Sequence, residues 1–113
     1  MSSLSGSKVR SLRRERHKLL GELSELSHVI HGSYFERYST CSRTNCACHE
    51  GKKHGPRAYV ALRRQGKPKQ HYVPKTQVTA VRDGIGQYHR MLQIADRITE
   101  INLELMRGGK LDE

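Results

Sequence analysis

All three cysteines of this 113-residue chain lie within one short polar stretch, where two histidines join them. The stretch runs from Cys41 to Pro56 and is rich in Gly, Ser, Asn and Lys, a mixture that sustains neither a helix nor a strand. Thiolates and imidazoles held so close together, with almost nothing apolar to bury, are typical of a four-ligand zinc site. We therefore predict that this stretch binds Zn²⁺. The predicted ligands are Cys41, Cys46, Cys48 and His54.

The spacing of these ligands is ordinary in its first half and unusual in its second. The first two cysteines are separated by four residues, whereas Cys46 and Cys48 form a compressed Cys-x-Cys that a histidine follows. His49 is the alternative to His54 as fourth ligand, although adjacent residues seldom direct both side chains at one ion. A disulfide or three free thiols are the other interpretations. The odd cysteine count and a start unlike a secretory signal favour reduced cysteines and a cytoplasmic location.

The positive charge is concentrated on and just after the cysteine stretch. The net charge is +10, and residues 32–75 carry ten Lys or Arg against two acids. Residues 1–31 carry six against three, and residues 76–113 carry five against six. Such a concentration predicts a polyanionic partner, with DNA first and RNA as the alternative. A generic solvated surface of a basic protein is the plainer interpretation.

An amphipathic helix is predicted before this basic module. Apolar residues recur at alternating gaps of three and four from Val9 to Ile30, interrupted only by Arg16. This pattern indicates a packing helix over residues 8–31 that Gly32 ends, after a loose tail at residues 1–7.

A second amphipathic helix is predicted over residues 76–107, followed by a loose tail at residues 108–113. Gly84 and Gly86 weaken it locally, so a bend or the close approach of another helix is expected there. Because this segment is slightly acidic, we expect it to pack along the basic first helix, in the same chain or in a second copy.

Between the helices the pattern favours β structure. Residues 33–40 read as a strand leading into the cysteine loop, and residues 57–64 and 68–73 read as a hairpin with a short Gly-containing turn. A two-stranded ribbon fits a DNA major groove, while an edge hairpin blunted by charge is the plainer alternative. The predicted nucleic-acid contacts are Lys52, Lys53, Arg57, Arg63, Arg64, Gln65, Lys67, Lys69 and Gln70, with Arg13 and Arg14 on the first helix.

Aromatic side chains on these strands suggest a further mode of contact. Tyrosines on strands are usually packing residues, but they are also the side chains on which RNA bases stack. The candidates are Tyr34, Tyr38, Tyr59 and Tyr72.

The chain is thus predicted to be α+β, with a three-stranded zinc-binding unit at residues 32–75 between two long helices. Only 35% of its residues are hydrophobic, with one Phe and no Trp, so the core must be thin. Such chains usually depend on a metal or a second subunit, and we expect a homodimer whose helices form an antiparallel or four-helix core. No apolar run is long enough to cross a bilayer.

The order of the motifs resembles a small uncharacterised family of prokaryotic domains, over about residues 30–105. Members associated with this pattern tend to lie near transposases or other mobile-element genes. The resemblance implies a DNA-linked accessory role, with a transposase or recombinase as a partner. Ser42 and Thr44 stand where the family more often has Gly and Pro. The motifs are Gly32-Ser33, Cys41-x4-Cys46-x-Cys48, His54-Gly55-Pro56, Tyr59 and Tyr72-Val73-Pro74.

Three functions compete on these observations. The leading one is a zinc-stabilised nucleic-acid-binding protein without enzymatic activity, acting as a DNA-binding regulator or as an accessory factor of a mobile element. A protein–protein interaction subunit of a larger nucleoprotein complex is the alternative. A small zinc hydrolase with Glu50 or His49 as base is the weakest, because the chain has no His-Glu-x-x-His motif and four protein ligands would leave no open zinc position.

Overall fold

The computed structural model describes residues 4–39, 51 and 54–112. For His54, Arg63 and Arg64 it describes the backbone alone. The three predicted cysteine ligands, the alternative ligand and two of the predicted phosphate contacts lie outside the described residues. They are Cys41, Cys46, Cys48, His49, Lys52 and Lys53.

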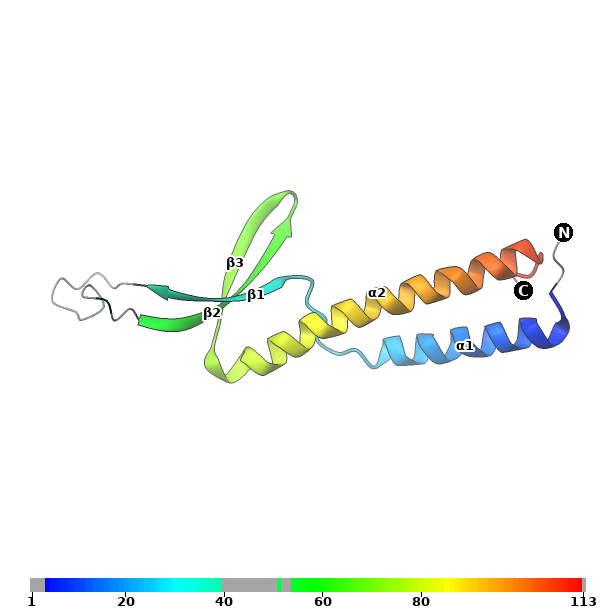
Figure 1. The fold of residues 1–113 in the computed structure, drawn as a ribbon, viewed down its shortest axis with the longest axis horizontal. Helices are drawn as coiled ribbons and strands as arrows, with labels where there is room; N and C mark the ends of the chain where they lie inside the picture. The colour runs from blue at the N-terminus through cyan, green and yellow to red at the C-terminus, as the bar shows by residue number, and fades with distance from the viewer. Residues whose placement is uncertain (1–3, 40–50, 52–53, 113) are drawn as a thin grey trace. The chain divides into compact units, whose positions relative to one another are not determined.

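The described chain confirms the predicted α+β class (Figure 1). An N-terminal helix is followed by a three-stranded antiparallel sheet and by a long C-terminal helix. The elements in chain order are α1 (Gly6–Ser24), β1 (Ser33–Ser39), β2 (His54–Arg64), β3 (Lys67–Val73), the 3₁₀ turn η2 (Lys75–Gln77) and α2 (Val78–Arg107). They form two compact units, a helical unit of residues 1–27 and 87–113 and a sheet unit of residues 28–86.

The helical unit is an antiparallel pair made of α1 and the C-terminal part of α2, which lie side by side in Figure 1. Its core consists of Val9 and Leu12 from α1 and of Ile101 and Leu105 from α2. Ile101 and Leu105 are completely shielded from solvent. The two amphipathic stripes therefore pack against each other within one chain, which was one of the two arrangements expected.

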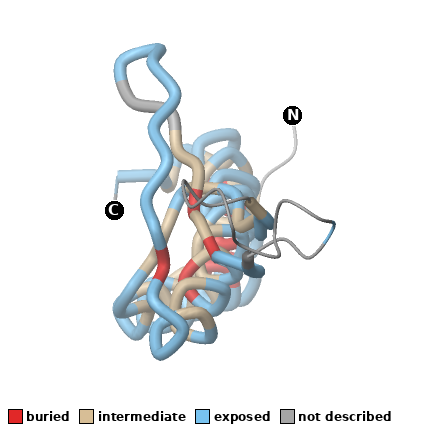
Figure 2. The backbone as a smooth tube through the Cα atoms, turned by 90° about the vertical axis from the view of Figure 1, so that its left-hand side faces the viewer, coloured by how far each residue is buried: buried red, intermediate tan, exposed pale blue. Residues whose placement is uncertain are grey.

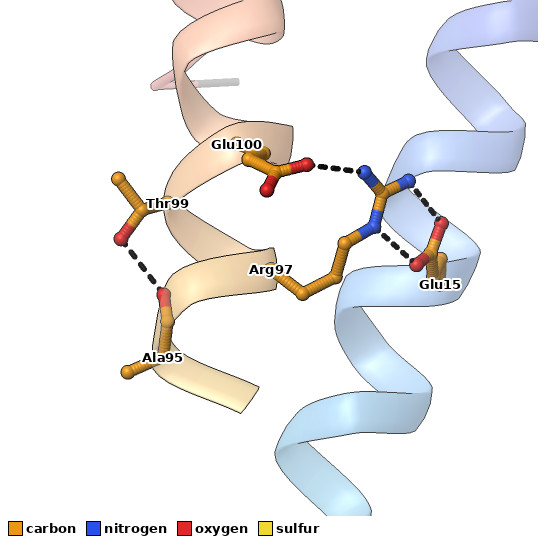
Figure 3. A network of polar contacts seen from close by, with 5 residues as sticks. All are labelled: Glu15, Ala95, Arg97, Thr99 and Glu100. Carbon is orange, nitrogen blue, oxygen red and sulfur yellow. Dashed lines mark hydrogen bonds and ion pairs between the residues drawn. The ribbon is translucent and has the colours of Figure 1, made fainter. Parts of the chain in front are cut away.

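The ion pairs that join the two helices run opposite to their overall charges. Arg97 on α2 donates to Glu15 on α1 at 2.8 Å and to its own neighbour Glu100 at 3.0 Å (Figure 3). Arg90 donates in the same way to Glu22 at 2.8 Å. The two helices pack together as expected, but the ion pairs between them join acids of α1 to arginines of α2. A net charge over thirty residues does not determine which side chains face a partner.

Helix α1 ends at Ser24, earlier than the predicted residue 31. Residues 25–32 form neither helix nor strand, and the N–H of Ile30 in this non-helical segment donates to the carbonyl of Gly84 at 3.0 Å. Ile30 packs against the core of the sheet unit and not on the helical seam. The apolar spacing continues past Ser24 because the non-helical segment also contributes apolar residues such as Ile30 to a core. The sequence pattern alone does not distinguish this case from a longer helix.

Gly84 is conspicuous because its backbone is the docking point of this non-helical segment. A Cβ atom at Gly84 would collide with the carbonyl oxygen of His28 and lie 3.1 Å from the side chain of Ile30. A chain segment does approach this glycine closely, as expected, but it is the non-helical segment that contains His28 and Ile30 and not a second helix. Gly32 has a similar reason, since its Cβ would lie 2.9 Å from the carbonyl oxygen of Ala61, and it does not end a helix.

The sheet unit has strand order β1-β2-β3, with β2 in the centre and antiparallel to both neighbours. Its core consists of Ala58, Val60 and Val73, and these residues are among those drawn in red in Figure 2. Helix α2 covers them with Val78, Val81 and Ile85. In β2 the buried Ala58 and Val60 are separated by the half-buried Tyr59, as a sheet packed mainly on one face requires.

The β2–β3 hairpin closes through a two-residue turn at Gln65 and Gly66, which confirms the predicted short turn. Both residues have positive φ, 52° and 76°, as a type I′ turn requires. Arg64 pairs with Lys67 beside the turn, so the next pair, which contains Pro68, is of the kind without mutual hydrogen bonds. The nitrogen of Pro68 therefore faces away from β2, where its missing N–H removes no bond from the ladder.

Candidate nucleic-acid interface and cysteine segment

The register of the sheet separates its residues into two faces. Residues directly opposite each other share a face, and neighbours along a strand alternate between faces. Ala58, Val60 and Val73 lie on the face that α2 covers. We call the other one the open face. Its described members are Ser33, Phe35, Arg37, Arg57, Tyr59, Ala61, Pro68, Gln70 and Tyr72.

Three aromatic rings form a continuous strip across the open face, one from each strand. Phe35 pairs with Tyr59, and Tyr59 pairs with Tyr72. The rings of Phe35 and Tyr59 are stacked with their centres 5.5 Å apart, and the ring of Tyr72 meets Tyr59 edge-on at 6.0 Å. Tyr72, at the edge of the strip, is 58% exposed. The strip is therefore a surface feature, separate from the core on the opposite face.

Arg37 lies over the centre of this strip. Its guanidinium carbon is 4.7 Å from the centre of the Tyr59 ring and 5.6 Å from that of Phe35. The guanidinium also donates to Gln70 Oε1 on β3 at 2.6 Å, so the side chain spans the sheet. Cation–π attraction and this hydrogen bond hold the planar group on the aromatic surface.

The predicted contact residues of the hairpin are divided between the faces. Arg57 and Gln70 belong to the open face, whereas Lys67 and Lys69 alternate with Pro68 and lie toward the other face near the turn. Arg57, Lys67, Lys69 and Gln70 are all exposed. Gln65 lies in the turn itself, and Arg63 and Arg64 are placed only as strand positions opposite Pro68 and Lys67. The hairpin thus presents positive charge on both of its sides.

Helix α1 holds the remaining predicted contacts. Arg14 is exposed, whereas Arg13 is half-buried and donates to the carbonyl of Lys110 at 3.2 Å. Arg16, which interrupts the apolar seam, donates to Asn102 Oδ1 at 2.7 Å. Arg13 therefore has a structural role in the helical pair, and of these two predicted contacts Arg14 is the one presented to solvent.

Acidic side chains are kept off the open face. Glu36 of β1 alternates with Phe35 and Arg37 and lies on the face that α2 covers, where Tyr34 donates to it at 2.9 Å. Burial raises the pKa of the Tyr34 phenol, and the hydrogen bond to Glu36 raises that pKa further. Tyr34 packs beside the core and carries Arg82 over its ring at 5.0 Å, so it is a packing residue and not a candidate for stacking.

The cysteine segment, residues 40–53, is bracketed by paired strand ends. Ser39 of β1 lies opposite His54 of β2, just past a register shift between Arg37 and Ser39. A cavity of about 470 Å³ opens nearby, lined among others by Glu36, Arg57 and Lys75. Within residues 4–39, 51 and 54–112, no three His, Cys, Asp or Glu side chains are grouped to hold a metal ion.

The family comparison adds to this geometry. The model of DUF6788, a domain of unknown function, matches residues 9–83. The chain belongs to the DUF6788 family. The predicted membership of an uncharacterised small domain family is thereby confirmed, although the match begins and ends earlier than residues 30–105. No curated protein and no solved structure matches the chain.

The DUF6788 match includes α1 from residue 9 onward, all three strands and the start of α2, and hence the whole open face. The sequence analysis did not identify Phe35 and Arg37 as members of a candidate binding surface. The available signal was the two-residue period, which places both on the same side of β1. Across the described parts of the chain, no helix is both long and apolar enough to cross a membrane.

Proposed function

We propose that this DUF6788 protein binds nucleic acid through its sheet unit, with a structural Zn²⁺ held by the cysteine segment. The observation that carries the proposal is the charge of the central and outer strands. β2 and β3 together contain Arg57, Arg63, Arg64, Lys67 and Lys69 and not a single Asp or Glu. A phosphate backbone laid along such a ribbon meets only positive charge, and each phosphate contact releases condensed counterions.

The paired strand ends support the metal part of the proposal. Consecutive Cα atoms are about 3.8 Å apart, so Cys41 is limited to roughly 7.6 Å from the Cα of Ser39, the residue opposite His54. Of the two outermost predicted ligands, His54 is at one paired strand end, and Cys41 follows the other end by two residues in sequence. Cys46 and Cys48 complete a closed four-ligand site in this proposal, and a closed site favours a structural ion over a catalytic one.

Binding is tested by mobility shift and fluorescence anisotropy over a salt series, with labelled duplex and single-stranded DNA and RNA. We expect binding that weakens steeply as salt rises. A matched pair of variants identifies the surface, because Lys69→Gln and Arg107→Gln each remove one exposed positive charge, the first from the hairpin and the second from the end of α2. Lys69→Gln should weaken binding more. Absence of binding to every nucleic acid at low salt would refute the proposal.

We further propose that the protein acts as a DNA-binding regulator or as an accessory factor of a mobile element, with a transposase or recombinase as partner. The support is the sequence resemblance and the basic ribbon. The alternative, an interaction subunit without its own nucleic-acid affinity, predicts a complex with a partner protein that survives nuclease treatment. The absence of that complex, together with salt-sensitive binding of nucleic acid by the purified protein, would decide between the two.

A further inference from the structure

We infer that the open face binds unpaired nucleobases, so that the preferred substrate is a single strand of DNA or RNA and not a duplex. This inference rests on the proposed nucleic-acid binding and names the substrate class. It depends on the strip formed by Phe35, Tyr59 and Tyr72 and on the arginine that lies over it.

The strip has the composition of a stacking surface and not of a core. The sheet's core of Ala58, Val60 and Val73 is on the opposite face, already covered by α2. Rings on the open face are therefore not needed to close that core. Tyr72 is 58% exposed and tilted by 72° to Tyr59, so part of its π surface is presented to solvent. A base that stacks on it would bury this surface without any rearrangement of the sheet.

Arg37 adds a second stacking surface with a charge. Its guanidinium is held over Tyr59 by the ring at 4.7 Å and by Gln70 at 2.6 Å. A guanidinium plane stacks on bases as aromatic rings do, and its outward N–H groups can bind phosphate. Arg57 lies directly opposite Arg37 in the ladder and is exposed, which places a second cation at the same end of the strip.

This arrangement favours unpaired bases for a geometric reason. In a duplex both faces of every base are covered by its stacked neighbours, and a protein reaches only base edges and the backbone. An aromatic ring binds a base by stacking, which needs an accessible base face. Single strands provide base faces, and the flanking arginines neutralise their phosphates. The Gln70 Oε1 atom already accepts from Arg37, so the Nε2 group is the part of this amide that could donate to the edge of a stacked base.

The test compares four variants on matched ligands. Tyr72→Ala removes a strip ring, and Tyr72→Phe keeps it. Tyr38→Ala is the control, because Tyr38 is equally exposed, at 59%, but outside the strip. Arg37→Gln removes the cationic plane. The ligands are uniform single-stranded DNA and RNA of equal length and a duplex of the same length, each titrated over the same series of salt concentrations.

We expect Tyr72→Ala to weaken single-strand binding by roughly 5- to 150-fold, the range for losing one stacked base. Tyr72→Phe should retain most of the affinity, and Tyr38→Ala should bind about as tightly as the unmodified protein. Arg37→Gln should lose about as much affinity as Tyr72→Ala. Single-strand DNA and RNA arms that differ would identify which of the two is preferred. Photocrosslinking of a 5-iodouracil-containing strand should attach to Tyr72 or a neighbouring residue of the strip.

The result that overturns this inference is distinct from the one that overturns the proposed function. If the protein binds duplex as tightly as single strands, and Tyr72→Ala and Tyr38→Ala behave alike, the stacking surface is refuted while nucleic-acid binding stands. If no ligand binds at low salt, both are refuted. Circular dichroism of each variant shows whether a loss of binding comes from unfolding, and the salt slope of Tyr72→Ala should stay unchanged, because a stacking residue carries no charge.

Discussion

Ser39 and His54 lie opposite each other in the β1–β2 ladder, at the two ends of the segment that contains all three cysteines. The sheet therefore already holds together the two residues that flank this segment. Folding of the sheet already brings Ser39 and His54 together, so the entropy lost in closing the intervening segment is not an added cost of binding an ion there. The fold and the proposed metal site thus support each other.

Replacing a predicted cysteine ligand should release zinc and loosen only the nearby strand ends. We expect Cys46→Ser to lose the ion in native mass spectrometry and to raise amide hydrogen exchange near Ser39 and His54. The core of the helical unit should exchange as before, since local openings follow local structure. Ser42→Ala, in the same segment, should keep its zinc.

The comparison of His49→Ala with His54→Ala identifies the fourth ligand, because only the true ligand's loss weakens zinc retention under a chelator. A purified, reduced protein without bound metal, in which Cys46→Ser leaves the exchange near Ser39 unchanged, would contradict the metal proposal.

Removing charge from the hairpin should change the salt dependence of binding and not only its strength. Each lost phosphate contact lowers the slope of log Kobs against log salt by about 0.9 for duplex DNA and about 0.7 for single strands. We expect Lys67→Gln with Lys69→Gln to reduce the slope by up to twice these amounts. Anisotropy titrations at four salt concentrations measure it, and an unchanged slope would place the phosphate contacts elsewhere.

Substitutions at the two glycines of α2 should have opposite effects on stability. Alanine at Gly84 would push a Cβ atom into the carbonyl of His28 and against Ile30, and we expect a loss of about 1 to 3 kcal/mol. Alanine at Gly86 meets nothing within 4 Å, so the better helix propensity should stabilise by up to about 1 kcal/mol. Urea unfolding measures both. Equal effects at the two positions would show that the non-helical segment of residues 25–32 does not dock on Gly84.

Acidification should weaken the helical unit. Hydrogen bonds from Arg97 and Arg90 lower the pKa values of Glu15 and Glu22 below the ordinary 4.5 of the unfolded chain. In that range the unfolded state binds more protons, so this stabilisation is present above about pH 4.5 and is lost as pH falls through the folded values. Urea midpoints from pH 7 to about pH 3 measure the loss.

The matched variants for this titration are Glu15→Gln with Glu22→Gln, and Glu25→Gln outside these ion pairs. The double variant should start from a lower stability at neutral pH and show a flatter decline, whereas Glu25→Gln should follow the unmodified protein. A double variant with the unmodified pH profile would show that these pairs do not contribute to it.

The proposed homodimer has a candidate surface on the C-terminal part of α2. Leu92, Leu103 and Met106 remain 45%, 43% and 51% exposed although the helix already packs on α1. We expect light scattering to give the mass of two chains, and Leu103→Glu with Met106→Glu to give that of one. Glu104→Gln, on the same helix, serves as the control. A monomeric unmodified protein at high concentration would refute the dimer.

Sequence patterns predicted the elements well where one period dominated. The second helix was expected at residues 76–107 and is observed at Val78–Arg107. The hairpin was expected because β-favouring runs flank a glycine, with a turn at residues 65–67 that the structure shortens to Gln65 and Gly66. The end of α1 was missed because Leu26 and Ile30 continue the helical period although both lie beyond the helix, where Ile30 packs on the core of the sheet unit. Local spacing carries no information about the partner that an apolar residue will meet.

The candidate site shows the same division. Positive charge on the hairpin was visible in the sequence, but its distribution over two faces followed only from the register, which separates Arg57 from Lys69. Phe35 and Arg37 were overlooked because they are far in sequence from Tyr72, with which they share a surface. Pairing of strands is a long-range property, and one chain read alone does not reveal it.

The orientation of Pro68 affects how the molecule behaves in crowded solution. Its ring nitrogen faces the outer edge of β3, so this edge lacks one N–H donor that an added strand would need. Lys67 and Lys69 lie on either side of this position. The missing donor and the two positive charges therefore disfavour the pairing of another polypeptide strand with β3. We therefore expect the open face beside β3 to stay accessible to ligands at protein concentrations where a sheet edge without these residues would pair with other copies.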